Sequence, residues 1–209
     1  QNVVFIPTQQ ELLTLTVDTP PASPTPTLQP AQTSTSSVTS TPLPSSVILE
    51  DIVFVSQNDR WNFCGPANLT MALNYWGWTG TKYAVGGAVK PGANDPAKDP
   101  NQRTNTDVNV MPYEMVDFVN DYTPYKALYR YGGDLDLLKR LIAGGFPVIA
   151  EKAVHQVLQP EGTLQWAGHF AFTTGYDDQA RQFIWQDSLL TEDEPVGMNK
   201  RSSYKEYLQ

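Results

Sequence analysis

One stretch decides how this chain folds, Trp61-Asn62-Phe63-Cys64-Gly65-Pro66-Ala67, and it contains the only cysteine of the 209 residues. Pro66 suits the first turn of a helix, where a missing N–H costs nothing, and the residues that follow predict a helix up to Gly77. The start of a helix presents unsatisfied N–H groups and the positive end of the helix dipole, which favour a thiolate. Cys64 is therefore a candidate nucleophile, and the alternative is a buried structural cysteine.

The predicted helix has one apolar face, because Leu69, Ala72, Leu73 and Trp76 recur at helical spacing. Further helices are expected over 112–119, after Pro112, and over 135–143, where Asp134 caps the start and two glycines end the helix. A long polar stretch, 86–109, predicts a functional or mobile loop. Strands are expected over the residues 53–55, 125–131, 147–151, 169–176 and 182–187. Helices followed by antiparallel strands indicate an α+β fold.

The last two predicted strands form a hairpin whose turn covers Asp177 to Ala180. With the turn centred near residue 178, His169 and Asp187 face each other across it, with β-carbons about 5 Å apart. A cysteine nucleophile needs a base and a group that orients the base, so this pair predicts a catalytic Asp–His couple. Taken singly, His169 also fits a surface or core histidine, and Asp187 also fits a strand-end residue that bonds its turn. His155 has no comparable setting and is expected at the surface.

An acyl-transfer site also needs hydrogen-bond donors for an oxyanion. Gln57 lies in the loop that leads to Cys64, and its side-chain amide and the Cys64 N–H are candidate donors. Taken alone, Gln57 is an ordinary loop glutamine.

Several of these motifs together resemble one known family. They are Ser56-Gln57, Cys64-Gly65-Pro66-Ala67, Gly168-His169-Phe170, Thr174-Gly175-Tyr176-Asp177-Asp178 and Gln186-Asp187-Ser188. The combination is similar to the papain-like cysteine peptidases (clan CA) of the double-glycine, or bacteriocin-processing, kind. More closely, residues 50–209 resemble the stand-alone family-thirty-nine-like domains of bacterial surface and secreted proteins.

The resemblance implies a papain-like fold, with the cysteine on a helix start and the histidine and aspartate on an antiparallel sheet. It implies Cys64 as nucleophile, His169 as base and acid, Asp187 as the group that orients the histidine, and Gln57 as oxyanion donor. The implied reaction is hydrolysis of an amide bond in a peptide or a peptidoglycan-type substrate. Two other functions stay open: a non-catalytic surface-binding module on the same scaffold, and an acyltransferase with the same triad.

The N-terminal region has a different composition. From Thr19 to Ser46, Pro, Ser and Thr fill 21 of 28 positions, so this segment cannot bury enough apolar surface to fold. We expect an N-terminal extension over 1–18, a disordered linker over 19–47 and a papain-like domain over 48–209. Such a spacer favours a secreted or surface-attached protein, although an ordinary linker is the alternative. The first residue is Gln1, which we interpret as processing or trimming.

Composition excludes several function classes. The net charge of −8 argues against a nucleic-acid partner and leaves no basic patch for anionic membranes. No apolar stretch approaches the roughly 18 residues that span a bilayer. The two histidines lie far from any cysteine pair, so we expect no zinc site and no cofactor. The aromatic residues Trp61, Phe63, Trp76, Trp78 and Trp166 are candidates for the floor of a substrate groove, with core packing as the alternative.

Overall fold

Most helices precede most strands along the chain, as predicted for an α+β protein. The computed structural model describes residues 42–60, 62–89, 110–158, 160–162 and 164–208, and of 153–158 and 164–167 it describes the backbone alone. In chain order the elements are β1 (Ser46–Ile48), α1 (Cys64–Tyr75), α2 (Lys82–Val89), α3 (Pro112–Tyr122), α4 (Leu135–Ala143), β2 (Val148–Leu158), β3 (Leu164–Asp177), β4 (Gln182–Gln186), β5 (Lys200–Ser203) and α5 (Tyr204–Tyr207).

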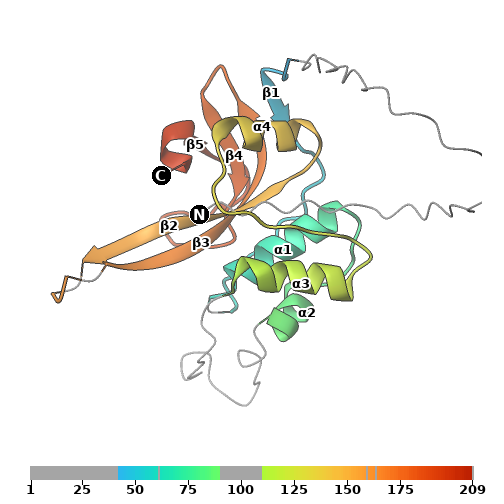
Figure 1. Cartoon of the computed structure of the whole chain (residues 1–209), viewed down its shortest axis with the longest axis vertical. Helices are drawn as coiled ribbons and strands as arrows, with labels where there is room; N and C mark the ends of the chain where they lie inside the picture. The colour runs from blue at the N-terminus through green and yellow to red at the C-terminus, as the bar shows by residue number, and fades with distance from the viewer. Residues whose placement is uncertain (1–41, 61, 90–109, 159, 163, 209) are drawn as a thin grey trace, which may run out of the picture. The chain divides into compact units, whose positions relative to one another are not determined.

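The strands form one antiparallel sheet around β3, which pairs with β1, β2 and β4, while β5 pairs with β4 (Figure 1). β2 and β3 are longer than the strands predicted for them. They form a hairpin arm where the sequence predicted a turn-rich segment up to Gly162. The sequence did not predict β1, β5 or α5.

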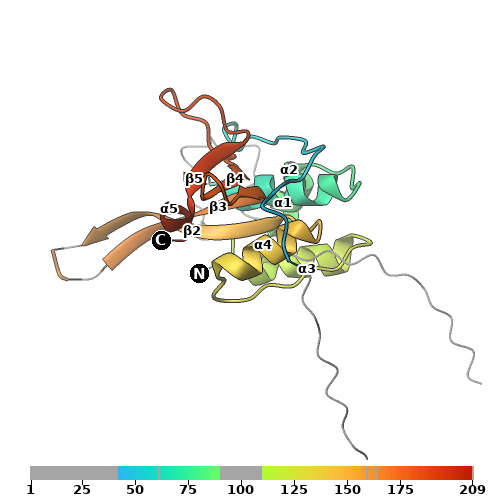
Figure 2. The ribbon, with the colours of Figure 1, turned by 90° about the horizontal axis from the view of Figure 1, so that it is seen from above.

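The sheet separates two hydrophobic cores. Successive residues of a strand point to opposite faces, and neighbours in β2 and β3 accordingly enter different cores. Ile149 and Phe170 join the core that α1, α2 and α3 form, whereas Ala150 and Ala171 join the core with α4 and α5. The two sets of helices therefore cover opposite faces of the sheet (Figures 1 and 2).

The predicted caps set the ends of two helices. In α4, the Asp134 carboxylate accepts a hydrogen bond from the N–H of Leu137 at 2.8 Å, and the helix ends before Gly144 and Gly145. Gly145 has φ of 84°, the left-handed conformation that a glycine adopts without strain. In α3, Pro112 occupies the first turn and Glu114 accepts a hydrogen bond from the N–H of Met111. Both helices bury one face.

α1 differs from the amphipathic helix that the sequence predicted. It begins at Cys64 itself, and every residue from Cys64 to Leu73 is buried. The reason is its position, because α1 packs against α2, α3 and β3 together. The helix that carries the cysteine is thus a central element of its core.

Two predicted strands are wrong. Residues 53–55 form no strand, and Phe54 and Val55 pack instead beside the α1 core. Residues 125–131 contain no strand either. There the Asn120 side chain accepts a hydrogen bond from the Ala127 N–H at 3.1 Å and replaces the strand partner that this backbone lacks.

Two other predictions concern segments that lie partly outside the described residues. Ser46 and Val47, assigned above to the end of the linker, belong to β1, while residues 1–41 lie outside the described residues. The domain boundaries therefore stay a prediction. The predicted 86–109 loop is wrong for its first residues, since α2 continues to Val89, and 90–109 lie outside the described residues. Within the described part of the chain, no helix is long and apolar enough to cross a membrane.

Candidate active site

Cys64 occupies the first turn of a buried helix. Its side chain is 7% exposed, and the thiol is free. The turn before it passes through Asn62, whose φ of 55° lies in the left-handed region that asparagine tolerates better than most residues. As the first residue of α1, Cys64 has a backbone N–H that no carbonyl of its own helix accepts. The cysteine therefore lies where the sequence placed it, beside the positive end of a helix dipole.

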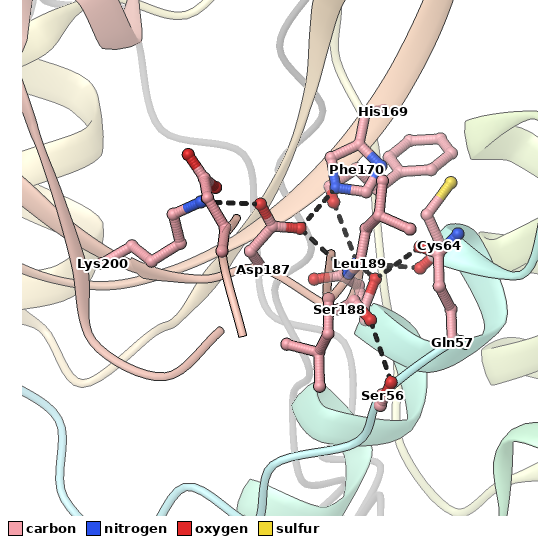
Figure 3. Close-up of polar contacts among 12 residues, drawn as sticks. Ser56, Gln57, Cys64, His169, Phe170, Asp187, Ser188, Leu189 and Lys200 are labelled. Atoms are coloured by element: carbon pink, nitrogen blue, oxygen red, sulfur yellow. Dashed lines mark hydrogen bonds and ion pairs between the residues drawn. The ribbon is translucent and has the colours of Figure 1, made fainter. Parts of the chain in front are cut away.

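His169 and Asp187 meet directly, with 2.8 Å between Nε2 of the imidazole and Oδ1 of the carboxylate (Figure 3). Both side chains are buried. The predicted register is nevertheless wrong by two residues. Phe172 pairs with Gln186, and β4 ends there, so His169 and Asp187 are not opposite partners. A bulge between Thr173 and Gly175 and a hairpin turn shifted toward Arg181 change the pairing, and the two side chains meet diagonally.

His169 also faces the thiol of Cys64. Burial raises the pKa of that thiol. The opposing effects are stronger and hold the pKa below the ordinary 9.0: a hydrogen bond to His169, the positive charge of His169, and hydrogen bonds from the backbone amides of Phe170 and Gly65. Because Nε2 is bonded to Asp187, the Nδ1 atom is the ring nitrogen that remains for the thiol. Figure 3 shows Cys64 and His169 on the same side of the site.

The imidazole is held in its charged form. Burial lowers the pKa of His169, but the bonds and charges of Asp187 and Cys64 outweigh it and raise the pKa to about 9. Burial raises the pKa of Asp187, and the bond to His169, the N–H of Leu189 and the Lys200 charge bring it below the ordinary 3.8. The site therefore shifts Cys64 toward the thiolate, and at neutral pH it holds His169 as an imidazolium and Asp187 as a carboxylate.

Gln57 is buried beside this row, and its amide orientation is fixed. Its Oε1 accepts a hydrogen bond from the Ser188 hydroxyl at 2.9 Å, and its backbone N–H donates to the Ser188 carbonyl at 2.8 Å. Since Oε1 is occupied, the NH₂ group remains for another acceptor. Gln57 thus offers the side-chain donor that the sequence predicted.

Asn68, which sequence reasoning missed, joins the parts of the site. The Nδ2 group of its buried side chain has two protons and lies within hydrogen-bond distance of three acceptors, which are the carbonyl of Cys64 at 2.8 Å, the carbonyl of Phe170 at 2.9 Å and the hydroxyl of Ser188 at 3.2 Å. These three acceptors belong to, or directly follow, the three candidate catalytic residues. The available signal was an asparagine inside the first turns of a mostly apolar helix, four residues after the cysteine.

The surroundings of Asp187 contain two more contacts that the sequence did not indicate. The N–H of Leu189 donates to Oδ1 at 3.0 Å, and Nζ of Lys200 lies 3.2 Å from Oδ2. Lys200 begins β5, an element that was not predicted. No motif spacing links residue 200 to residue 187, so only the sheet pairing of β4 with β5 reveals this contact.

The described aromatic residues of the proposed groove floor pack internally. Phe63 is 1% exposed and its ring lies against Gly86 of α2, while Trp76 lies near Phe146 and Trp78 near Phe118. Trp61 and the side chains of Trp166 and His155 lie outside the described residues. Over the described ranges, no group of His, Cys, Asp and Glu side chains is arranged to hold a metal ion.

The arrangement of these groups is the one expected of a cysteine peptidase. It combines a buried thiol at a helix start, an imidazole held by a carboxylate, and a side-chain amide beside them. A family model agrees with this class. The chain matches the model described as the Peptidase_C39 like family over residues 49–209, most of its length, and it belongs to that family. The recognition made from the sequence motifs is therefore confirmed, and the enzyme is a cysteine peptidase by family.

Among solved structures, the chain is similar to xylellain, a cysteine protease from Xylella fastidiosa. The two share 15% sequence identity with a TM-score of 0.49, and the match covers 78% of this chain and 81% of that one. A search of curated proteins found no match.

Proposed function

We propose that this cysteine peptidase hydrolyses a peptide or peptidoglycan-type amide bond with Cys64 as nucleophile, His169 as acid and base, Asp187 as the group that orients His169, and Gln57 as oxyanion donor. The observation that carries the proposal is the 2.8 Å bond between His169 and Asp187 beside a thiol of lowered pKa. A buried histidine whose pKa is raised to about 9 stays protonated at neutral pH and stabilises the thiolate.

The geometry supports a two-step reaction. The Cys64 thiolate attacks the amide carbon, and the new oxyanion accepts hydrogen bonds from the Cys64 N–H and from the NH₂ group of Gln57. As the C–N bond breaks, the departing amine takes the proton of His169. Water then gives a proton to the neutral imidazole and attacks the thioester, which releases the acid and restores the thiolate–imidazolium pair.

The first test measures the ion pair without any knowledge of the substrate. We expect iodoacetamide to alkylate wild-type Cys64 fast at pH 5–6, because the proposed ion pair with His169 forms the thiolate there. In His169→Ala the reaction should become slow and rise only above about pH 8, as for an ordinary thiol. Cys64→Ala controls for other reactive groups, and circular dichroism shows whether each variant is folded. A wild-type rate that rises only above that pH would contradict the proposal and favour a non-catalytic binding module.

We also propose that the peptidase acts outside the cytoplasm, on a cell surface or in the medium. The support is the Pro-, Ser- and Thr-rich stretch from Thr19 to Ser46, whose composition suits an extended spacer. Labelling of intact cells with an antibody to residues 48–209 tests this proposal. Signal that depends on breaking the cells would contradict it.

A further inference from the structure

Both oxygens of the Asp187 carboxylate have partners, and the partner of Oδ2, Lys200, has no role in the reaction just proposed. Oδ1 is bonded to His169 and to the N–H of Leu189, whereas Oδ2 lies 3.2 Å from the Lys200 ammonium. The Lys200 side chain is 22% exposed and that of Asp187 is 12% exposed, so water screens this ion pair less than it screens a surface pair.

Lys200 is itself held in place from several directions. It lies opposite Trp185 in the β4–β5 pairing, with Nζ 5.1 Å from the centre of the Trp185 ring. Its ammonium also forms an ion pair with Glu194. The loop between Asp187 and Lys200 returns so that Gly197 accepts a hydrogen bond from the Asp187 N–H at 2.8 Å. The lysine is therefore a built part of the site and not a free surface cation.

The charges around His169 come from several elements. Cys64 of α1 and Asp187, which follows β4, favour the protonated ring. Lys152 of β2 lies opposite His169 in the strand pairing, but its ammonium stacks over the rings of Trp185 and Tyr207, 4.6 and 4.3 Å from their centres. Lys152 interacts through its charge with Asp187, Lys200 and Glu206 without an ion pair to Asp187 among the described contacts, and Glu194 pairs with Lys200. Lys200 is thus the cation bonded to the carboxylate that holds His169.

We propose that Lys200 is a positioning residue of this site, which holds the second oxygen of Asp187 and, by its charge, limits how strongly that carboxylate retains the proton on His169. The inference rests on the proposed function. A cation on Oδ2 cancels part of the negative potential at the imidazole, and it keeps Oδ1 turned toward Nε2. The lysine thereby keeps the imidazolium acidic enough to give its proton to a leaving amine.

The chain is well suited to a direct test, because it has only two histidines. In a His155→Gln background, the imidazole C–H resonance of His169 can be followed by NMR from pH 5 to 11, and its midpoint is the pKa of the ring. We expect Lys200→Met to raise this pKa by about 0.5 unit or more, because a nearby cation is removed. Lys200→Arg, which keeps the charge and the donors, should stay within about 0.2 unit of wild type.

Lys139→Met is the matched control. Lys139 also forms a partly buried ion pair with an aspartate, Asp178, at 2.6 Å, but neither residue contacts the proposed site. This variant should lose stability as Lys200→Met does, without moving the His169 pKa. An unchanged or lowered pKa in Lys200→Met, or an equal rise in Lys139→Met, overturns the inference.

The same titration separates this inference from the proposed function. A wild-type His169 that titrates near 6.5 would contradict the proposed ion pair. The difference between wild type and Lys200→Met would still measure the effect of Lys200 on the Asp–His couple. Conversely, a raised wild-type pKa that is the same in Lys200→Met would retain the proposed function and remove Lys200 from it.

Discussion

Hydrogen bonds that are already made decide which atoms of the site remain for chemistry. The bond from His169 to Asp187 uses Nε2 and leaves Nδ1 for the thiol, and the Ser188 hydroxyl uses Oε1 of Gln57 and leaves its NH₂ group. The hydroxyl of Ser188 has one proton, and it accepts a hydrogen bond from Asn68, so its proton is directed to Gln57. A buried chain of polar groups therefore orients the amide of the proposed oxyanion donor.

A substitution of Gln57 should separate two reactions of the same thiol. Alkylation by iodoacetamide forms no oxyanion, whereas acylation by p-nitrophenyl acetate does. We expect Gln57→Ala to leave alkylation at pH 6 unchanged and to slow the release of p-nitrophenol by about 100-fold, the effect of losing one oxyanion donor. The control is Gln179→Ala, an exposed residue of the β3–β4 turn. An equal loss in both reactions would instead indicate damage to the ion pair.

The packing of α2 on the loop before Cys64 depends on one glycine. A Cβ built on Gly86 would lie 2.4 Å from the Phe63 ring, so the close contact requires a residue without a side chain. Phe63 directly precedes the cysteine, and α2 therefore supports the start of α1. Lys82 of the same helix pairs with Asp59 and donates to the Ser56 carbonyl, on either side of Gln57.

Two neighbouring glycines of α2 allow a matched comparison. Gly86 is buried and Gly87 is exposed. Gly87→Ala should stabilise the protein by up to about 1 kcal/mol, because alanine favours a helix. Gly86→Ala has the same helical advantage, but we expect a net loss of about 1–3 kcal/mol, since its methyl group overpacks against Phe63. Urea unfolding measures both, and equal effects would contradict the close packing.

The elements also show what could be predicted from the sequence. Local signals sufficed for α4, where Asp134 and the two glycines set both ends, and for the motif residues around Cys64. Pairing could not be predicted in this way, because a single bulge at Thr174 changes every register position beyond it. Lys200 was missed for the same reason, since its contact with Asp187 exists only through the pairing of β4 with β5. Asn68 was missed because polarity in a helix predicts exposure, and here it marks a buried junction.

The site couples the stability of the protein to pH through two groups with opposing effects, His169 and Cys64. A folded pKa of about 9 for His169 contributes stability below the unfolded value of 6.5, and this contribution is lost as the pH rises toward 9. The lowered pKa of Cys64 acts in the opposite direction, because its contribution grows up to the unfolded value of 9.0. The two contributions oppose each other over the pH range in which both groups change charge.

Removal of the thiol should expose the histidine term. In Cys64→Ser, His169 stays bonded to Asp187, so its folded pKa stays raised, although by less than in wild type, while the compensating thiolate is gone. We expect the free energy of unfolding of this variant, relative to wild type, to fall by up to about 1.4 kcal/mol per pH unit above pH 6.5. Urea unfolding at pH 6, 7, 8 and 9 measures the difference. Parallel curves for the two proteins would show that the thiol and the imidazole do not share a charge.

The buried amide of Asn68 ties the first turn of α1 to segments that the ribosome makes about a hundred residues later. Until the sheet has folded against the helix, Cys64 has neither its imidazole nor its fixed carbonyl. A nascent or partly opened chain therefore carries an ordinary, protonated thiol. Under the proposed mechanism the peptidase becomes chemically competent only with these later strands in place, so that its own folding limits when and where it can begin to cut.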